Sequence, residues 1–153
     1  SGLSKLFPRS KRFAQYNMAV VYAIHGTFVD LIIGAFMLMR SEALEQEGLL
    51  DGAFFMYGED LDLCYRIKQH GWRVVYHPAV TVLHLKGRAS RKASRRAIIA
   101  FYDAMKIFHD KHYRAQTHFV VNLGIDLGVA ILRGVALLRD RLLPSERKHV
   151  ASA

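Results

Sequence analysis

Hydrophobic positions predict several short strands in the first half of the chain. Residues 29–39, VDLIIGAFMLM, are rich in β-branched and aromatic residues and predict a buried strand. Residues 73–76 and 80–85 are also β-rich, and they are separated by His77 and Pro78. Because proline cannot donate a hydrogen bond to a sheet, we expect two short strands there, or one strand and an extended edge.

Helical patterns occupy most of the remaining chain. A short helix is expected over residues 42–47, with Ser41 as its cap and Gly48 after its end. Residues 59–70 begin with acidic side chains and end with basic ones, which predicts a second helix. From residue 98, apolar residues recur every three or four positions and predict an amphipathic helix. Its expected apolar stripe consists of Ile98, Phe101, Met105 and Phe108.

The stretch 118–138 is 21 residues long and mostly apolar, but it contains Asn122, Asp126 and Arg133. A spanning helix needs about 20 apolar residues, and a charge near its centre costs roughly 2.5–3.5 kcal/mol on insertion scales. We therefore expect a helix that lies on a membrane surface or against the domain, and not one that crosses the bilayer.

The composition adds a strong positive charge. The chain has 22 Lys and Arg against 13 Asp and Glu, a formal charge of +9, and its 52% hydrophobic content excludes a disordered chain. The single cysteine, Cys64, excludes an internal disulfide, and no zinc-type Cys/His spacing occurs. Residues 1–20 lack a secretory signal pattern, and we expect a cytosol-facing protein that is a piece of something longer.

Three carboxylates stand at the start of the predicted helix 59–70: Glu59, Asp60 and Asp62. A helix turns about 100° per residue, so Asp60 and Asp62 point about 200° apart and cannot both chelate one ion. Asp62 precedes Arg66 by four residues, the spacing of a surface ion pair. Asp60 precedes Cys64 by four residues and heads the apolar face.

This position gives Asp60 the features of a general base. A carboxylate at the edge of a core, beside Glu59 and after the Tyr57-Gly58 turn, is expected to have raised proton affinity and access to substrate. The alternative is that acidic residues here only stabilise a helix N-terminus through the macrodipole. For Asp62 we keep this structural interpretation.

Several blocks, by their order and spacing, resemble glycosyltransferase family 2 in the branch that includes bacterial rhamnosyltransferases. They are GAFMLMR (34–40), GLLD (48–51) and FFMYGEDLDLCYRIKQHGWRVVYHPAVTVLH (54–84). The resemblance implies the C-terminal part of a GT-A type α/β fold, a short mixed sheet with flanking helices, followed by two C-terminal helices. We expect an acceptor-side half over residues 1–95 and amphipathic or apolar, membrane-associated helices over residues 96–153.

The resemblance also implies roles for single residues. The second carboxylate of the Glu-Asp pair is the base in this family, which is Asp60 here, and Glu59 helps to place the acceptor or the base. His84, 24 residues after Asp60, is implied as a ligand of the nucleotide-bound Mg²⁺ or Mn²⁺. The expected substrate-binding residues are Gly34, Tyr57, Lys86 and Arg88. The family's nucleotide-binding β-α-β half and its D-x-D have no counterpart here, so this chain alone is not expected to bind a sugar nucleotide well.

A basic stretch, KGRASRKASRR, covers residues 86–96 and has six basic residues and no acid. It is either a solvated loop and helix entry or a contact for a diphosphate or for anionic lipid headgroups. A nucleic-acid partner is not expected, because the nearby Phe101 and Phe108 lie on a helical stripe and form no exposed stacking platform.

Together these features predict an inverting, metal-dependent glycosyltransferase of cell-envelope glycan synthesis. It would move a sugar, with rhamnose as the candidate, from a nucleotide-sugar donor to a lipid-linked or polysaccharide acceptor. The expected location is cytoplasmic, peripheral to the inner face of the bacterial plasma membrane and in contact with its anionic surface. The alternative, motivated by the missing donor half, is a non-catalytic basic membrane-associated module or partner subunit.

Overall fold

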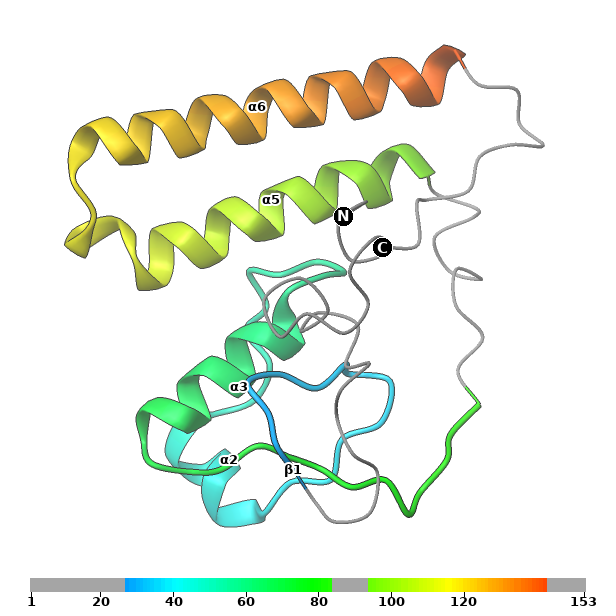
Figure 1. The fold of residues 1–153 in the computed structure, drawn as a ribbon, viewed down its shortest axis with the longest axis vertical. Helices are drawn as coiled ribbons and strands as arrows, with labels where there is room; N and C mark the ends of the chain where they lie inside the picture. The colour runs from blue at the N-terminus through cyan, green and yellow to red at the C-terminus, as the bar shows by residue number, and fades with distance from the viewer. Residues whose placement is uncertain (1–26, 84–93, 143–153) are drawn as a thin grey trace.

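The computed structural model describes residues 27–83 and 94–142, which form a small α/β unit and a long helical hairpin (Figure 1). In Figure 1, α3 lies between the first, short elements and α5, and α6 lies on the far side of α5. The elements are β1 (Thr27–Phe28), α2 (Ser41–Glu47), α3 (Glu59–Gln69), β2 (Val75–Tyr76), α5 (Ser94–His112), the 3-10 helix η2 (Arg114–Gln116) and α6 (Phe119–Leu142).

The sheet in the described residues is a single antiparallel pair, in which β1 lies beside β2 with Phe28 opposite Val75. The predicted strand over residues 29–39 is wrong, because that segment consists of loop and turn. Of the two later strands, only residues 75–76 form one, residues 80–83 are not a strand, and residues 84–85 lie outside the described part. The predicted burial is met only in part: Val29, Ile32, Met37 and Met39 are partly buried against the core, whereas Ile33, Phe36 and Leu38 are exposed.

The core is built on the inner face of α3. Leu63, Cys64 and Ile67 are buried there together with Val74. The predicted helix and its apolar stripe are therefore confirmed, and so is the short helix α2, which ends at Glu47 with Gly48 as its C-cap. Ser41 is the first residue of α2 and not its cap, because Arg40 occupies the cap position with extended dihedrals.

The predicted amphipathic helix is confirmed as α5, but a different face of it is buried. Ala97, Ala100 and Ala104 are buried, whereas Phe101 and Met105 are 45% and 47% exposed. The small side chains allow close approach of the loop before α3: a Cβ placed on Gly58 would lie 3.2 Å from Ala104 Cβ. The alanine face of α5 is buried because only small side chains fit at this short distance from the loop, and hydrophobic periodicity does not report that distance.

The last helix, α6, runs antiparallel to α5 (Figure 1). By length and composition it is apolar enough to cross a membrane, and only 6% of its most apolar window is buried. Its polar residues contact α5, since Asp126 lies 2.9 Å from the Lys106 ammonium and Arg133 lies 2.8 Å from Asp103. The expectation that this helix lies against the domain is therefore met along its polar side.

Candidate active site

The carboxylate of Asp60 lies in the first turn of α3 and is held by two backbone N–H groups. Gly34 donates to its Oδ2 at 2.9 Å, and Leu61 donates to its Oδ1 at 2.8 Å. Each carboxylate oxygen can accept a second hydrogen bond, so the group keeps acceptor capacity after both contacts are made. The side chain is partly exposed, which leaves it accessible.

Two glycines permit this arrangement. Gly58 precedes α3 with φ of 87°, in the left-handed region, and a Cβ there would lie 3.1 Å from the ring of Phe54. Gly34 is separated from Asp60 by 26 residues, and a Cβ on it would lie 3.3 Å from Asp60 Cβ. The structure thus brings two predicted site residues, Gly34 and Asp60, into direct contact.

Glu59 and Tyr57 flank the base candidate. The Oε2 atom of Glu59 is buried, and no described residue hydrogen-bonds it. The ring of Tyr57 packs edge-to-face on Phe101 of α5, with centroids 5.8 Å apart. The start of α3 is thereby attached to α5 on one side and to the Gly34 turn on the other.

Asp62 is fully buried, so the expected surface position is wrong, although the ion pair with Arg66 forms at 2.8 Å. The end of α5 covers it: the Lys111 ammonium lies 3.0 Å from Oδ2, and His112 Nε2 lies 2.7 Å from Oδ1. Lys111 also pairs with Asp51 at 2.6 Å. These partners are 49 and 50 residues away in sequence, beyond what helical spacing can indicate.

This buried cluster keeps Asp62 ionised. Burial raises the pKa of the Asp62 carboxyl, but hydrogen bonds from Arg66, His112 and Lys111 outweigh it and hold the pKa below its ordinary value. Burial lowers the pKa of Lys111, but its hydrogen bonds to Asp51 and Asp62 produce a net rise. The cluster is therefore a charged link between α3 and α5.

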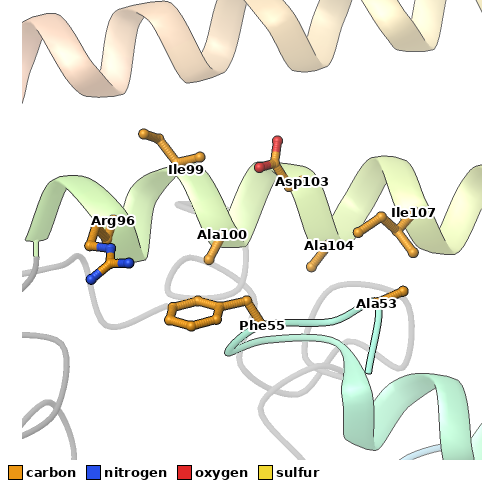
Figure 2. Close-up of a pocket in the computed structure, with 8 residues that line it drawn as sticks. All are labelled: Ala53, Phe55, Arg96, Ile99, Ala100, Asp103, Ala104 and Ile107. Atoms are coloured by element: carbon orange, nitrogen blue, oxygen red, sulfur yellow. The ribbon is translucent and has the colours of Figure 1, made fainter. Parts of the chain in front are cut away.

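An open groove of about 350 Å³ runs between α5 and the loop at residues 53–55 (Figure 2). At one end the Arg96 guanidinium lies 5.7 Å from the centroid of the Phe55 ring. Ala104 lines the groove and also faces Gly58, so the groove reaches the start of the helix that carries Asp60. The lining residues are Ala53, Phe55, Arg96, Ile99, Ala100, Asp103, Ala104 and Ile107.

Three predicted site residues, His84, Lys86 and Arg88, lie outside the described residues. Within the described ranges, no group of three His, Cys, Asp or Glu side chains is arranged to hold a metal ion. The part of the chain that the structure describes therefore does not by itself fit Mg²⁺ or Mn²⁺.

The part of the chain that contains the acidic motif matches a known protein family. The profile of a family described as "Glycosyltransferase like family 2" matches residues 8–104. The chain belongs to this family. Membership implies a GT-A-type α/β fold, of which the β1–β2 pair is the sheet within the described residues. No solved structure matches the chain significantly.

Two curated relatives of this family 2 chain are rhamnosyltransferases, which confirms the resemblance to that branch. One is the N-acetylglucosaminyl-diphospho-decaprenol L-rhamnosyltransferase of Mycobacterium tuberculosis, 31% identical over 126 residues, covering 80% of this chain and 39% of the relative. The other is the rhamnosyltransferase WbbL of Escherichia coli, 41% identical over 58 residues, covering 38% of this chain and 22% of the relative. The chain thus spans less than half the length of these relatives.

Proposed function

We propose that residues 1–95 form the acceptor-side half of an inverting glycosyltransferase in which Asp60 is the general base. The donor is a nucleotide sugar, with rhamnose as the candidate sugar, and the acceptor is a lipid-linked glycan or a polysaccharide of the cell envelope. The names of both relatives support rhamnose, and the name of the mycobacterial relative supports a lipid diphosphate acceptor. The place of action is the cytoplasmic face of the membrane.

The observation that carries this proposal is the Asp60 carboxylate, accessible and fixed by the Gly34 and Leu61 amides. One of its oxygens accepts a hydrogen bond from the hydroxyl of the sugar acceptor. It takes the hydroxyl proton as the hydroxyl oxygen attacks the anomeric carbon. The new carbon–oxygen bond forms on one face of the sugar. The bond to the nucleoside diphosphate breaks on the opposite face, so the configuration inverts.

Glu59 acts beside the base as a positioning residue. Its buried Oε2 has no hydrogen-bond partner among the described residues, and a buried polar atom of this kind is costly to leave unpaired. Because this oxygen is closed to solvent, Glu59 acts on the protein side of the site and helps to place Asp60. Proton transfer is thus assigned to Asp60 and positioning of the base to Glu59.

Enzymes of this family generally depend on a divalent metal, which would stabilise the departing diphosphate as a Lewis acid. Since the described residues do not form a metal site, its ligands would come from elsewhere, with His84 as the candidate in this chain. None of the steps assigned to Asp60 and Glu59 depends on the position of that ion.

The groove beside α5 supports a lipid-linked acceptor. Its lining is mainly apolar but includes Asp103, and the Arg96 guanidinium at one end would contact the anionic diphosphate of such an acceptor. Lys86 and Arg88, which precede Arg96 in the sequence, would add further positive charge for the diphosphate.

The decisive test is Asp60→Asn in an enzyme that joins this chain to a nucleotide-binding half. The turnover number should fall about 10²–10⁴-fold, because the amide cannot take the proton. Donor affinity, measured by calorimetry, should not change. Asp30→Asn is the matched control, since Asp30 is 87% exposed and pairs with Lys68.

An undiminished turnover number in Asp60→Asn would refute the assignment of the base. If the intact wild-type enzyme transfers no sugar from any nucleotide donor, the non-catalytic membrane module becomes the better account.

A further inference from the structure

The outer face of α6 is apolar over its whole length. Leu127, Ile131 and Val135 follow one another at intervals of four residues and therefore share a face, and each is between 55% and 59% exposed. In Figure 1, α6 lies at the edge of the molecule, with α5 on one side of it. The large exposed apolar residues of α6 are Phe119, Val120, Val121, Leu123, Leu127, Ile131, Leu132, Val135, Leu138 and Leu142.

The opposite side of α6 carries the polar residues Asn122, Asp126 and Arg133 among half-buried apolar ones and is joined to the preceding helices. His109 Nε2 lies 2.7 Å from Asn122 Oδ1, and the Arg114 guanidinium donates to both oxygens of Asp126 at 2.7 and 2.9 Å. Arg133 pairs with Asp103 further along. The polar residues that argue against a spanning helix are thus all directed to the α5 side.

This arrangement selects one orientation relative to a bilayer. If α6 crossed a membrane, its ion-paired partners on α5 would enter the hydrocarbon with it, and charges at that depth oppose insertion. An orientation in the membrane plane leaves α5 and the ion pairs in water and buries only the outer face of α6. The 24 residues of α6 would then lie along about 36 Å of the surface.

Basic residues mark the end of the hairpin where α6 finishes. Arg139 and Arg141 are exposed and two positions apart, so they project about 200° from each other on the two sides of the apolar face. Cations beside an apolar face complement anionic headgroups.

We propose that α6 binds in the plane of an anionic membrane surface, with its outer face at the boundary of headgroups and acyl chains and with α5 on the aqueous side. This inference deepens the membrane location in the proposed function. It names the binding surface and its lipid partner. It needs no catalytic activity, so its test and the test of Asp60 fail independently.

The first experiment is flotation of the 153-residue chain with vesicles of phosphatidylglycerol and phosphatidylcholine at low salt. The chain should float with the mixed vesicles and much less with phosphatidylcholine alone. The combined variant Leu127→Gln, Ile131→Gln and Val135→Gln should lower the partition coefficient at least about tenfold, since three exposed apolar side chains lose their burial in lipid. Leu38→Gln, at a 91% exposed site outside α6, is the matched control and should bind like the wild type.

The charge arm uses Arg139→Gln and Arg141→Gln. Each substitution should weaken binding to the anionic vesicles about fivefold, because a basic residue near such a surface contributes about that factor. Binding to neutral vesicles should not change.

A third measurement distinguishes an in-plane helix from a spanning one. A fluorophore is attached to cysteines introduced at Leu127, Val135 or Leu142, while the buried Cys64 is protected from labelling. Quenching by spin-labelled lipids should report the same shallow depth at all three positions. A spanning helix would give depths that differ by about 10 Å between successive positions.

Four results would overturn the proposal. The first three are absence of flotation at low salt, equal flotation of the triple variant and the wild type, and graded depths along α6. The fourth is a chain that does not bind vesicles and forms a dimer, with the triple variant monomeric. The last result would mean that a second copy of the chain covers the outer face.

Discussion

Replacing Asp62 with asparagine removes one charge from the buried cluster that joins α3 to α5 and nearly conserves the shape of the side chain. In the native protein this carboxylate contacts Arg66 at 2.8 Å, His112 at 2.7 Å and Lys111 at 3.0 Å. The substitution leaves these groups, gathered around a fully buried site, without their shared counter-charge.

The expected cost follows from the burial. Removing one partner of a buried ion pair destabilises a protein by about 3–5 kcal/mol. Lys111 keeps Asp51 at 2.6 Å, and the Asn oxygen can still accept from Arg66, so we expect the lower end, about 3 kcal/mol. For a chain of this size, that corresponds to a fall in Tm of roughly 6–12 °C.

Urea unfolding followed by far-UV circular dichroism measures the difference, and its pH dependence tests the cause. The folded-state pKa of Asp62 is depressed, so its stabilisation is fully present above the unfolded value of about 3.9 and is lost as pH falls through the folded value. The difference in free energy of unfolding between wild type and Asp62→Asn should therefore be fully present at about pH 5. It should narrow below about pH 4.

Asp30→Asn is the control, because an exposed ion pair such as Asp30 with Lys68 contributes about 0–1 kcal/mol. If Asp62→Asn costs no more than this control, the buried cluster does not hold α3 against α5. A cycle with Lys111→Met adds an independent check, since contacting residues couple by about 0.5–3 kcal/mol and unlinked residues do not.

Three further predictions follow from the same geometry. Gly58→Ala should lower the free energy of unfolding in urea by about 1–3 kcal/mol, because alanine is strained at φ of 87°; unchanged stability would contradict this. Gly34→Ala should reduce kcat of the intact enzyme, because the new Cβ would lie 3.3 Å from Asp60 Cβ and displace the base; an unaltered kcat would show that this contact does not position the base. Hydrogen bonds from the Arg114 guanidinium lower the pKa of Asp126 to about 2. The ion pair is therefore fully present above about pH 3.9 and is lost as the pH falls through about 2, and amide exchange of α6 should accelerate in that window. Amide exchange of α6 that is already fast at about pH 5 would argue against the pairing.

Local sequence patterns were sufficient for the helices. The inner face of α3 and the limits of α2 follow from spacing and end signals, which act within a few residues of one another. The family also followed from sequence, because the order of several blocks is a property of the chain itself. The roles of Glu59, Asp60, Tyr57 and Gly34 remain predictions.

The same patterns failed where a contact depends on segments far apart in the chain. Four apolar residues of the segment 29–39 pack on the core, and nothing in the composition of the segment states whether a neighbouring strand is present to pair with it. Asp62 is spaced for a surface pair with Arg66, but the end of α5 buries it. On α5, Ala100 and Ala104 are buried in place of Phe101, because the loop before α3 approaches too closely for a large side chain.

The sequence by itself determined the helices, the acidic motif at the start of α3 and the family, because periodicity, end signals and block order are local or collinear properties. Only the tertiary structure placed the Gly34 amide on the Asp60 carboxylate, 26 residues away, and paired Asp126 and Arg133 of α6 with residues of α5. These placements depend on which surfaces meet when the chain folds. The physical reason is that burial and charge pairing are energies of contact between segments, and separation along the chain does not specify them.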